Sequence, residues 1–164
     1  MKISTKQLAQ IGMSAAIVFV VTFLVRIPVP GTQGGYINFG DIAIYISAYL
    51  LGGPAGAIAA AIGSGAADIA AGAPVYAAGT FVIKGVMGLL VGLLAANKGL
   101  SRFAAAATLA GAGMVAGYAL YELALFGGAY ALTAIPMNLV QMVGCSVVAT
   151  VVYPVARRVK LHRN

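Results

Sequence analysis

Residues 103–126 read FAAAATLAGAGMVAGYALYELALF, and this stretch decides the fold class. It contains one charged residue, Glu122, and is longer than the roughly 20 apolar residues that an α-helix needs to cross a bilayer. The same character extends over the chain, because 62% of its 164 residues are hydrophobic and only 8% are charged. A soluble domain carries about 25% charged residues. The sequence therefore predicts an integral membrane protein.

Similar apolar stretches, separated by Gly, Pro and basic residues, lie on both sides of this one. The predicted helices cover residues 7–26, 38–52, 55–72, 80–96, 102–126 and 135–156. The first is not expected to be a secretory signal, because no A-x-A cleavage site follows it. Many of the 22 glycines lie inside the stretches, where small residues let helices approach closely in lipid. We predict an all-α protein, a compact bundle of six transmembrane helices in a single domain, 1–164.

Basic residues predict the orientation of this bundle. Six crossings place most of them on one side: Lys2, Lys6, Lys98, Arg102, Arg157, Arg158, Lys160 and Arg163, with His162 beside them. Excess Lys and Arg mark the cytoplasmic side of a membrane protein. We therefore expect both termini in the cytoplasm and outer loops at about 27–38, 73–79 and 127–135. The net charge of +7 reflects this topology, and no nucleic-acid partner is expected.

Polar side chains gather near the predicted outer ends of five helices. These residues are Asp41, Asp68, Lys84, Glu122, Asn138 and Gln141. An ionisable group inside a membrane span is costly and is by default a functional-site candidate. The inner halves of the helices carry little polar besides Ser and Thr. This pattern predicts a cup that opens outwards and is closed below by apolar packing, whereas a channel would need polar residues throughout.

Several of these residues also fit structural roles. Asp41 follows Asn38 by three residues, as in a helix N-cap with its acidic partner. Asp68 and Lys84 flank one turn and could form a structural ion pair in the pocket wall. The tyrosines fit either ligand contacts, as Tyr45 and Tyr118 would near Asp41 and Glu122, or an aromatic belt at the membrane interface. By contrast, Glu122, Asn138 and Gln141 have no local partner, which favours a role in ligand binding.

Motifs for catalysis are missing from the sequence. It has no G-x-x-x-x-G-K-[ST] loop and no H-E-x-x-H motif, and His162 and Cys145 are its only histidine and cysteine. We therefore expect no enzyme activity, no cofactor, no metal site and no ATP hydrolysis by this chain.

A set of short motifs resembles a known family. They are IPVP (27–30), GYINFGDI (35–42), LGGPAG (51–56), IGSGAAD (62–68), PVYA (74–77), IKG (83–85) and PMNLVQ (136–141). Together they are similar to the substrate-binding (S) component of an energy-coupling factor (ECF) vitamin transporter, most of all to the riboflavin-type group.

The resemblance implies a subunit of the prokaryotic plasma membrane that captures a small water-soluble vitamin or precursor at the outer face. Riboflavin, a vitamin B6 type compound and hydroxymethylpyrimidine all suit the polar residues. The subunit would dock on a module made of a transmembrane coupling subunit and two ABC-type ATPases, which hydrolyse the ATP. The family's A-x-x-x-A docking surface on the first helix corresponds to Gly12, Ala15 and Ala16.

The expected ligand-binding residues are Asp41, Tyr45, Asp68, Tyr76, Lys84, Tyr118, Glu122, Asn138 and Gln141. Two other functions remain open at this stage: a self-sufficient small carrier or channel that works as an oligomer, and a membrane subunit with no transport role.

Overall fold

The computed structural model describes residues 4–30, 35–96 and 98–161, so that Lys2, His162 and Arg163 lie outside the described residues. In these ranges the chain forms helices and two short strands. Their order is α1 (Thr5–Leu24), β1 (Arg26–Pro28), β2 (Tyr36–Asn38), α2 (Gly40–Leu51), α3 (Gly53–Ala70), α4 (Pro74–Ala95), α5 (Leu100–Phe126) and α6 (Gly128–Leu161). The protein is thus mostly helical with six described helices, as the sequence predicts.

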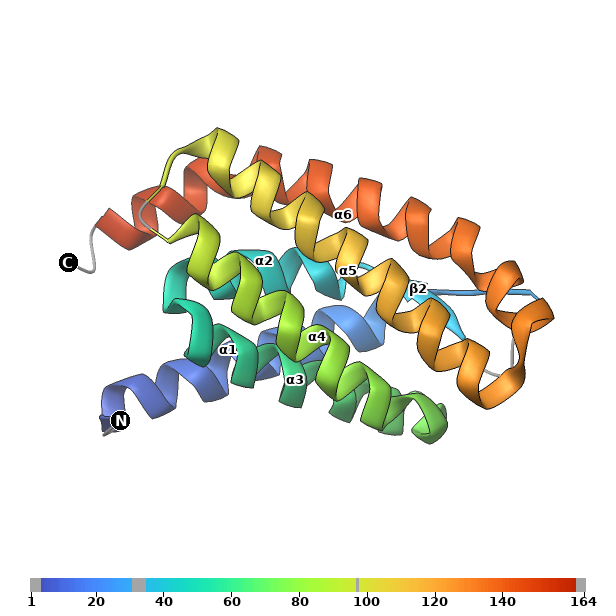
Figure 1. Cartoon of the computed structure of the whole chain (residues 1–164). Helices are drawn as coiled ribbons and strands as arrows, with labels where there is room; N and C mark the ends of the chain where they lie inside the picture. Colours follow the sequence, from blue (N-terminus) through green and yellow to red (C-terminus); the bar gives the residue numbers. More distant parts are fainter. Residues whose placement is uncertain (1–3, 31–34, 97, 162–164) are drawn as a thin grey trace.

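Successive helices run back and forth between two ends of the bundle (Figure 1). The start of α1 and the end of α6 lie at one end, which we call the termini end, together with the α2–α3 and α4–α5 connections. The opposite end, the hairpin end, holds β1 and β2 and the α3–α4 and α5–α6 connections. The strands pair antiparallel, with Arg26 opposite Asn38, and apart from Arg26 they lie in the segment 27–38 that was expected to be a loop.

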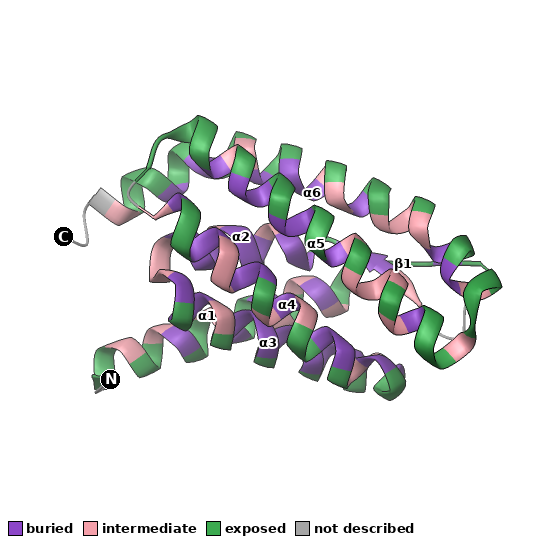
Figure 2. Cartoon of the chain, in the orientation of Figure 1, coloured by how far each residue is buried: buried purple, intermediate pink, exposed green. Residues whose placement is uncertain are grey.

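The long helices have the character of membrane spans. Among the described residues, α1, α4, α5 and α6 are long and apolar enough to cross a bilayer, whereas the 12-residue α2 and the 18-residue α3 fall short of that standard. Their outward faces carry exposed apolar side chains such as Leu132 and Val151, which are 70% and 73% exposed. Figure 2 shows this exposed face along α5 and α6. Apolar surface on this scale belongs in contact with lipid.

Two helices, α4 and α6, begin at least six residues earlier than the sequence patterns indicate. Helix α4 begins at Pro74 rather than at residue 80, because the fixed φ of proline suits the first turn of a helix. Helix α6 begins at Gly128 rather than at residue 135, directly after Gly127, whose φ of +86° ends α5. The predicted outer loops 73–79 and 127–135 are therefore almost entirely helical, and Pro136 lies inside α6.

Helices α3 and α4 pack with their backbones in contact. A Cβ atom added to Gly88 would lie 2.6 Å from the Gly56 carbonyl oxygen, and one added to Gly92 would lie 2.4 Å from the Gly53 backbone nitrogen. Such small residues replace the hydrophobic driving force that helices lack in lipid.

We expect Gly92→Ala to lower the free energy of unfolding by about 1–3 kcal/mol, the usual cost of overpacking. Its new methyl group would meet the backbone of α3. The matched control is Gly113→Ala on α5, where an added Cβ meets nothing within 4 Å. Thermal unfolding in detergent measures both variants. Equal unfolding temperatures for the two would show that the α3–α4 contact is not tight.

Candidate functional site

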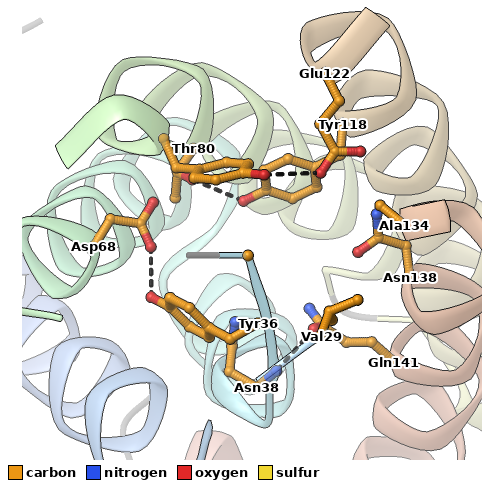
Figure 3. Close-up of a pocket in the computed structure, with 12 residues that line it drawn as sticks. Val29, Tyr36, Asn38, Asp68, Thr80, Tyr118, Glu122, Ala134, Asn138 and Gln141 are labelled. Atoms are coloured by element: carbon orange, nitrogen blue, oxygen red, sulfur yellow. Dashed lines mark hydrogen bonds between the residues drawn. The ribbon is translucent and has the colours of Figure 1, made fainter. Parts of the chain in front are cut away.

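A pocket lies at the hairpin end of the bundle (Figure 3). It encloses about 460 Å³ of space between atoms, including its opening to solvent. Its walls come from the hairpin, α3, α4, α5 and α6. The lining residues are Val29, Gly35, Tyr36, Asn38, Asp68, Tyr76, Thr80, Tyr118, Glu122, Ala134, Asn138 and Gln141.

Two carboxyl groups face each other across this pocket, Asp68 on α3 and Glu122 on α5 (Figure 3). Both side chains are buried, at 5% and 3% exposure. Oδ1 of Asp68 accepts a hydrogen bond from the Tyr36 hydroxyl at 2.5 Å, and Oε1 of Glu122 accepts one from the Tyr76 hydroxyl at 3.2 Å. Among the described residues, none donates a hydrogen bond to Asp68 Oδ2 or Glu122 Oε2. None of the described lining residues carries a positive charge, and the nearest cation to the Tyr118 wall is Lys84, whose Nζ lies 5.4 Å from the centroid of that ring.

The hairpin is fastened to α3 by Tyr36. Burial and the neighbouring Asp68 carboxylate raise the pKa of the Tyr36 phenol above its ordinary value, so its hydroxyl stays protonated and donates. The Arg26 guanidinium lies 5.5 Å from the centroid of the Tyr36 ring and also contacts the Ala71 carbonyl oxygen. These contacts hold the hairpin beside the pocket.

Aromatic rings form another wall. The ring centroids of Tyr76 and Tyr118 are 6.4 Å apart. The Tyr118 hydroxyl bonds to Thr80 Oγ1 at 2.8 Å, and the Tyr76 hydroxyl bonds to that of Tyr130 at 2.7 Å. Because their hydroxyl groups are held in this way, the rings offer fixed apolar faces to a planar ligand.

The floor of the pocket is a buried polar network. The Asn38 backbone N–H donates to Gln141 Oε1 at 2.8 Å, and Gln141 Nε2 donates to Asp41 Oδ2 at 2.7 Å. The other oxygen of Asp41 forms an ion pair with Lys84 Nζ at 2.5 Å. Asp41 and Lys84 are 0% and 1% exposed and do not line the pocket. The network joins β2, α2, α4 and α6 directly below the pocket.

The structure brings most of the predicted ligand-binding residues together. The pocket is lined by Asp68, Tyr76, Tyr118, Glu122, Asn138 and Gln141. Asp41 and Lys84 lie beneath it. Tyr45 does not line it, because its side chain is 0% exposed and packs in the main apolar core, to which all six described helices contribute.

Two structural interpretations of the sequence are wrong. Lys84 pairs with Asp41 and not with Asp68, whose carboxylate bonds to Tyr36. Asn38 is not the N-cap of α2, because it belongs to β2 and the helix begins at Gly40 with Phe39 as its cap. Its Oδ1 nevertheless accepts a hydrogen bond from the N–H of Gly40, the first residue of α2, at 2.9 Å, as a capping side chain would.

Other lining residues were not predicted to bind ligand, namely Val29, Gly35, Tyr36, Asn38, Thr80 and Ala134. The sequence offered one signal for three of them, because Tyr36, Asn38 and Thr80 lie in or next to the family-like motifs. Val29, Gly35 and Ala134 carry no chemical signal of their own. Among the described residues no group of three or more His, Cys, Asp or Glu side chains converges as a metal site would require.

The predicted docking residues on α1 divide into two sets. Gly12 and Ala16 are exposed on one side of the helix. Ala15 is 8% exposed and packs with Ala55 and Ala59 of α3, so it is not accessible to a partner.

Comparisons with known proteins agree with this architecture. The family model described as "ECF-type riboflavin transporter, S component" matches residues 2–158. The thiamine precursor transporter HmpT of Lactococcus lactis subsp. cremoris is 28% identical over 153 residues, which is 93% of this chain and 89% of HmpT. An uncharacterised protein of Pyrococcus woesei is 39% identical over 129 residues, 77% of this chain and 84% of its own.

The fold has a solved counterpart. The S component of a bacterial ECF transporter superposes with a TM-score of 0.73 at 23% identity, covering 94% of this chain and 98% of its own. The family match, which spans nearly the whole sequence, confirms the resemblance seen in the motifs. The chain therefore belongs to the family of ECF-type riboflavin transporter S components, the substrate-binding subunits through which such transporters take up a vitamin or its precursor.

Proposed function

We propose that this S component captures a small planar vitamin precursor of the aminopyrimidine type, such as hydroxymethylpyrimidine, in the pocket at the hairpin end. One observation carries the proposal: the buried oxygens Asp68 Oδ2 and Glu122 Oε2 accept no hydrogen bond from residues 4–30, 35–96 or 98–161. A buried acceptor without a donor costs about 1–3 kcal/mol, and more when charged, so a ligand that donates to both oxygens gains that energy on binding.

The chemistry of the ligand follows from this polarity. The amino and hydroxymethyl groups of an aminopyrimidine donate hydrogen bonds, and its ring can carry a proton beside a carboxylate. The flavin ring system of riboflavin presents mainly carbonyl and ring-nitrogen acceptors, which would leave the carboxylates without partners unless the sugar chain reached them. The relative HmpT, which aligns with most of this chain, is described as a thiamine precursor transporter. This description supports the same ligand class.

Tyrosine rings and amides complete the recognition. Tyr76 and Tyr118 stack on the planar ring, while Asn138 and Gln141 of α6 hydrogen-bond its edge. Asp68 and Glu122 bind the donating substituents. Asp41 and Lys84 support the floor without touching the ligand.

The orientation of the bundle is part of the proposal. All six helices cross the membrane, with the short α2 and α3 completed by the hairpin and the neighbouring helices. Lys98, Arg102, Arg157 and Arg158 belong to the termini end, which faces the cytoplasm by the positive-inside rule. The pocket therefore opens to the outside of the prokaryotic plasma membrane.

The termini end is closed by aromatic packing. The rings of Tyr49, Phe103 and Tyr153 pack with centroid separations of 4.9–5.6 Å. This cluster argues against a self-sufficient channel, since a pathway through the chain would need polar residues there. Release of the ligand to the cytoplasm instead requires the separate module of a coupling subunit and two ATPases, and this chain contributes neither a cofactor nor ATP hydrolysis.

Docking on that module uses the small-residue face of α1 around Gly12 and Ala16. Neither residue is needed for packing within the chain, because both are exposed and a Cβ added at Gly12 meets nothing within 4 Å. A flat face of this kind lets a partner helix approach closely in lipid.

We expect Glu122→Gln to weaken binding of hydroxymethylpyrimidine at least about tenfold, since a hydrogen bond to a charged group contributes about 1.5–3 kcal/mol. Asp68→Asn should act in the same direction. Isothermal titration calorimetry of the purified protein in detergent measures both.

The neighbouring substitution Tyr121→Phe is the matched control, because the Tyr121 hydroxyl bonds to the Val75 carbonyl oxygen and does not line the pocket. Affinity for hydroxymethylpyrimidine should stay within about twofold in this variant. Tighter binding of riboflavin than of the pyrimidine, unaffected by Glu122→Gln, would contradict the proposed ligand class.

We expect Gly12→Leu to abolish ATP-dependent uptake while leaving ligand binding intact, because the larger side chain separates α1 from the coupling subunit. Uptake of labelled hydroxymethylpyrimidine into proteoliposomes that contain the complete transporter gives the readout. Gly113→Leu on α5 makes the same change at another open, exposed position and should transport normally. Uphill uptake by vesicles containing this chain alone would overturn the need for a module.

A further inference from the structure

The Gln141 amide at the pocket floor has a forced orientation. Its Oε1 faces the Asn38 backbone N–H, which can only donate, and its Nε2 faces Asp41 Oδ2, which accepts. Rotating the amide by half a turn would set donor against donor at Asn38 and oxygen against oxygen at Asp41. The network therefore allows one arrangement of the amide.

This orientation decides what the pocket floor offers to a ligand. The amide nitrogen points to Asp41 and to Met114 Sδ at 3.6 Å, and neither of these residues lines the pocket. The carbonyl oxygen lies on the side of Asn38, which does line the pocket. A carbonyl oxygen has two lone pairs, and one accepts from Asn38, so that a second hydrogen bond, from a ligand, is within its capacity.

The orientation depends on Asp41, and Asp41 in turn is held by Lys84. The two Asp41 oxygens have different donors: Oδ1 accepts from Lys84 Nζ, and Oδ2 accepts from Gln141 Nε2. Both charged side chains are almost completely buried. Their position below the pocket means that they can influence a ligand without contacting it.

We propose that Asp41 is a specificity-determining positioning residue, which fixes Gln141 as a hydrogen-bond acceptor at the pocket floor and so selects ligands that present a donor there. This inference rests on the proposed function and goes beyond it, because it assigns selectivity to a residue outside the pocket.

The experiment compares two ligands that differ at one position: hydroxymethylpyrimidine and its oxo analogue, in which a carbonyl oxygen replaces the amino group. The readout is the ratio of their dissociation constants. We expect the wild-type protein to favour the amino compound and Asp41→Asn to reduce this preference at least tenfold. In that variant Lys84 keeps the amide oxygen of residue 41 and the amide nitrogen faces Gln141, so Gln141 meets a donor on both sides and its acceptor orientation is no longer the only one allowed.

A general loss of stability cannot produce this result, because a smaller folded fraction weakens both ligands equally. Lys84→Met is the matched comparison: it breaks the same ion pair but keeps the carboxylate that orients Gln141. It should lower the unfolding temperature and retain the preference. In a Gln141→Ala background, Asp41→Asn should leave the ratio unchanged.

The outcomes separate the two proposals. A wild-type protein that binds neither pyrimidine overturns the proposed ligand class and this selectivity with it. A wild-type preference that survives Asp41→Asn, or that Lys84→Met reduces equally, overturns the positioning role alone. If Asp41→Asn does not fold, Gln141→Ala still decides: Asp68 and Glu122 keep their own part of the preference for the amino compound, so a preference as large as that of the wild type without the Gln141 amide contradicts the inference.

Discussion

The ion pair between Asp41 and Lys84 is the contact on which the polar end of this protein depends. Both charges are buried in a bundle whose surroundings are lipid and apolar side chains, where an unpaired charge is very costly. Removing one partner of such a pair costs about 3–5 kcal/mol. Because the pair joins α2 to α4, and Gln141 extends it to α6 and β2, one electrostatic requirement fixes the position of four elements around the pocket.

The rest of the bundle is organised around the opposite requirement, which is close apolar packing. Glycine contacts bring the α3 and α4 backbones together, and aromatic rings close the termini end. The three acidic residues of the chain are Asp41, Asp68 and Glu122, and all of them lie at the hairpin end. This asymmetry suits a protein that captures a ligand from one side and depends on a partner to release it on the other.

Much of the architecture could be predicted, because the apolar stretches and the depth of the polar residues are local properties of the sequence. They indicated the helices and, among the lining residues, Asp68, Glu122 and Gln141. The partner of Lys84 could not be predicted, since two acids lie at similar depth and helix rotation decides between them. Asp68 is nearer in sequence, yet Asp41, on another helix, makes the contact. The prediction that Tyr45 binds ligand was wrong for the same reason. Tyr45 shares a helix with Asp41, but its side chain points into the core.

Hydrogen bonding separates the residues that hold the structure from those that await a ligand. Both oxygens of Asp41 are bonded within the protein, and the residue does not line the pocket, so this carboxylate holds the structure together. Asp68 and Glu122 each accept a hydrogen bond with one oxygen, from tyrosines that fix their positions, and the other oxygen has no donor in the part of the chain that the structure describes. An oriented but incompletely bonded carboxylate costs stability in the protein by itself. A donating ligand reverses that cost, so affinity and ligand-dependent stability arise from the same two atoms.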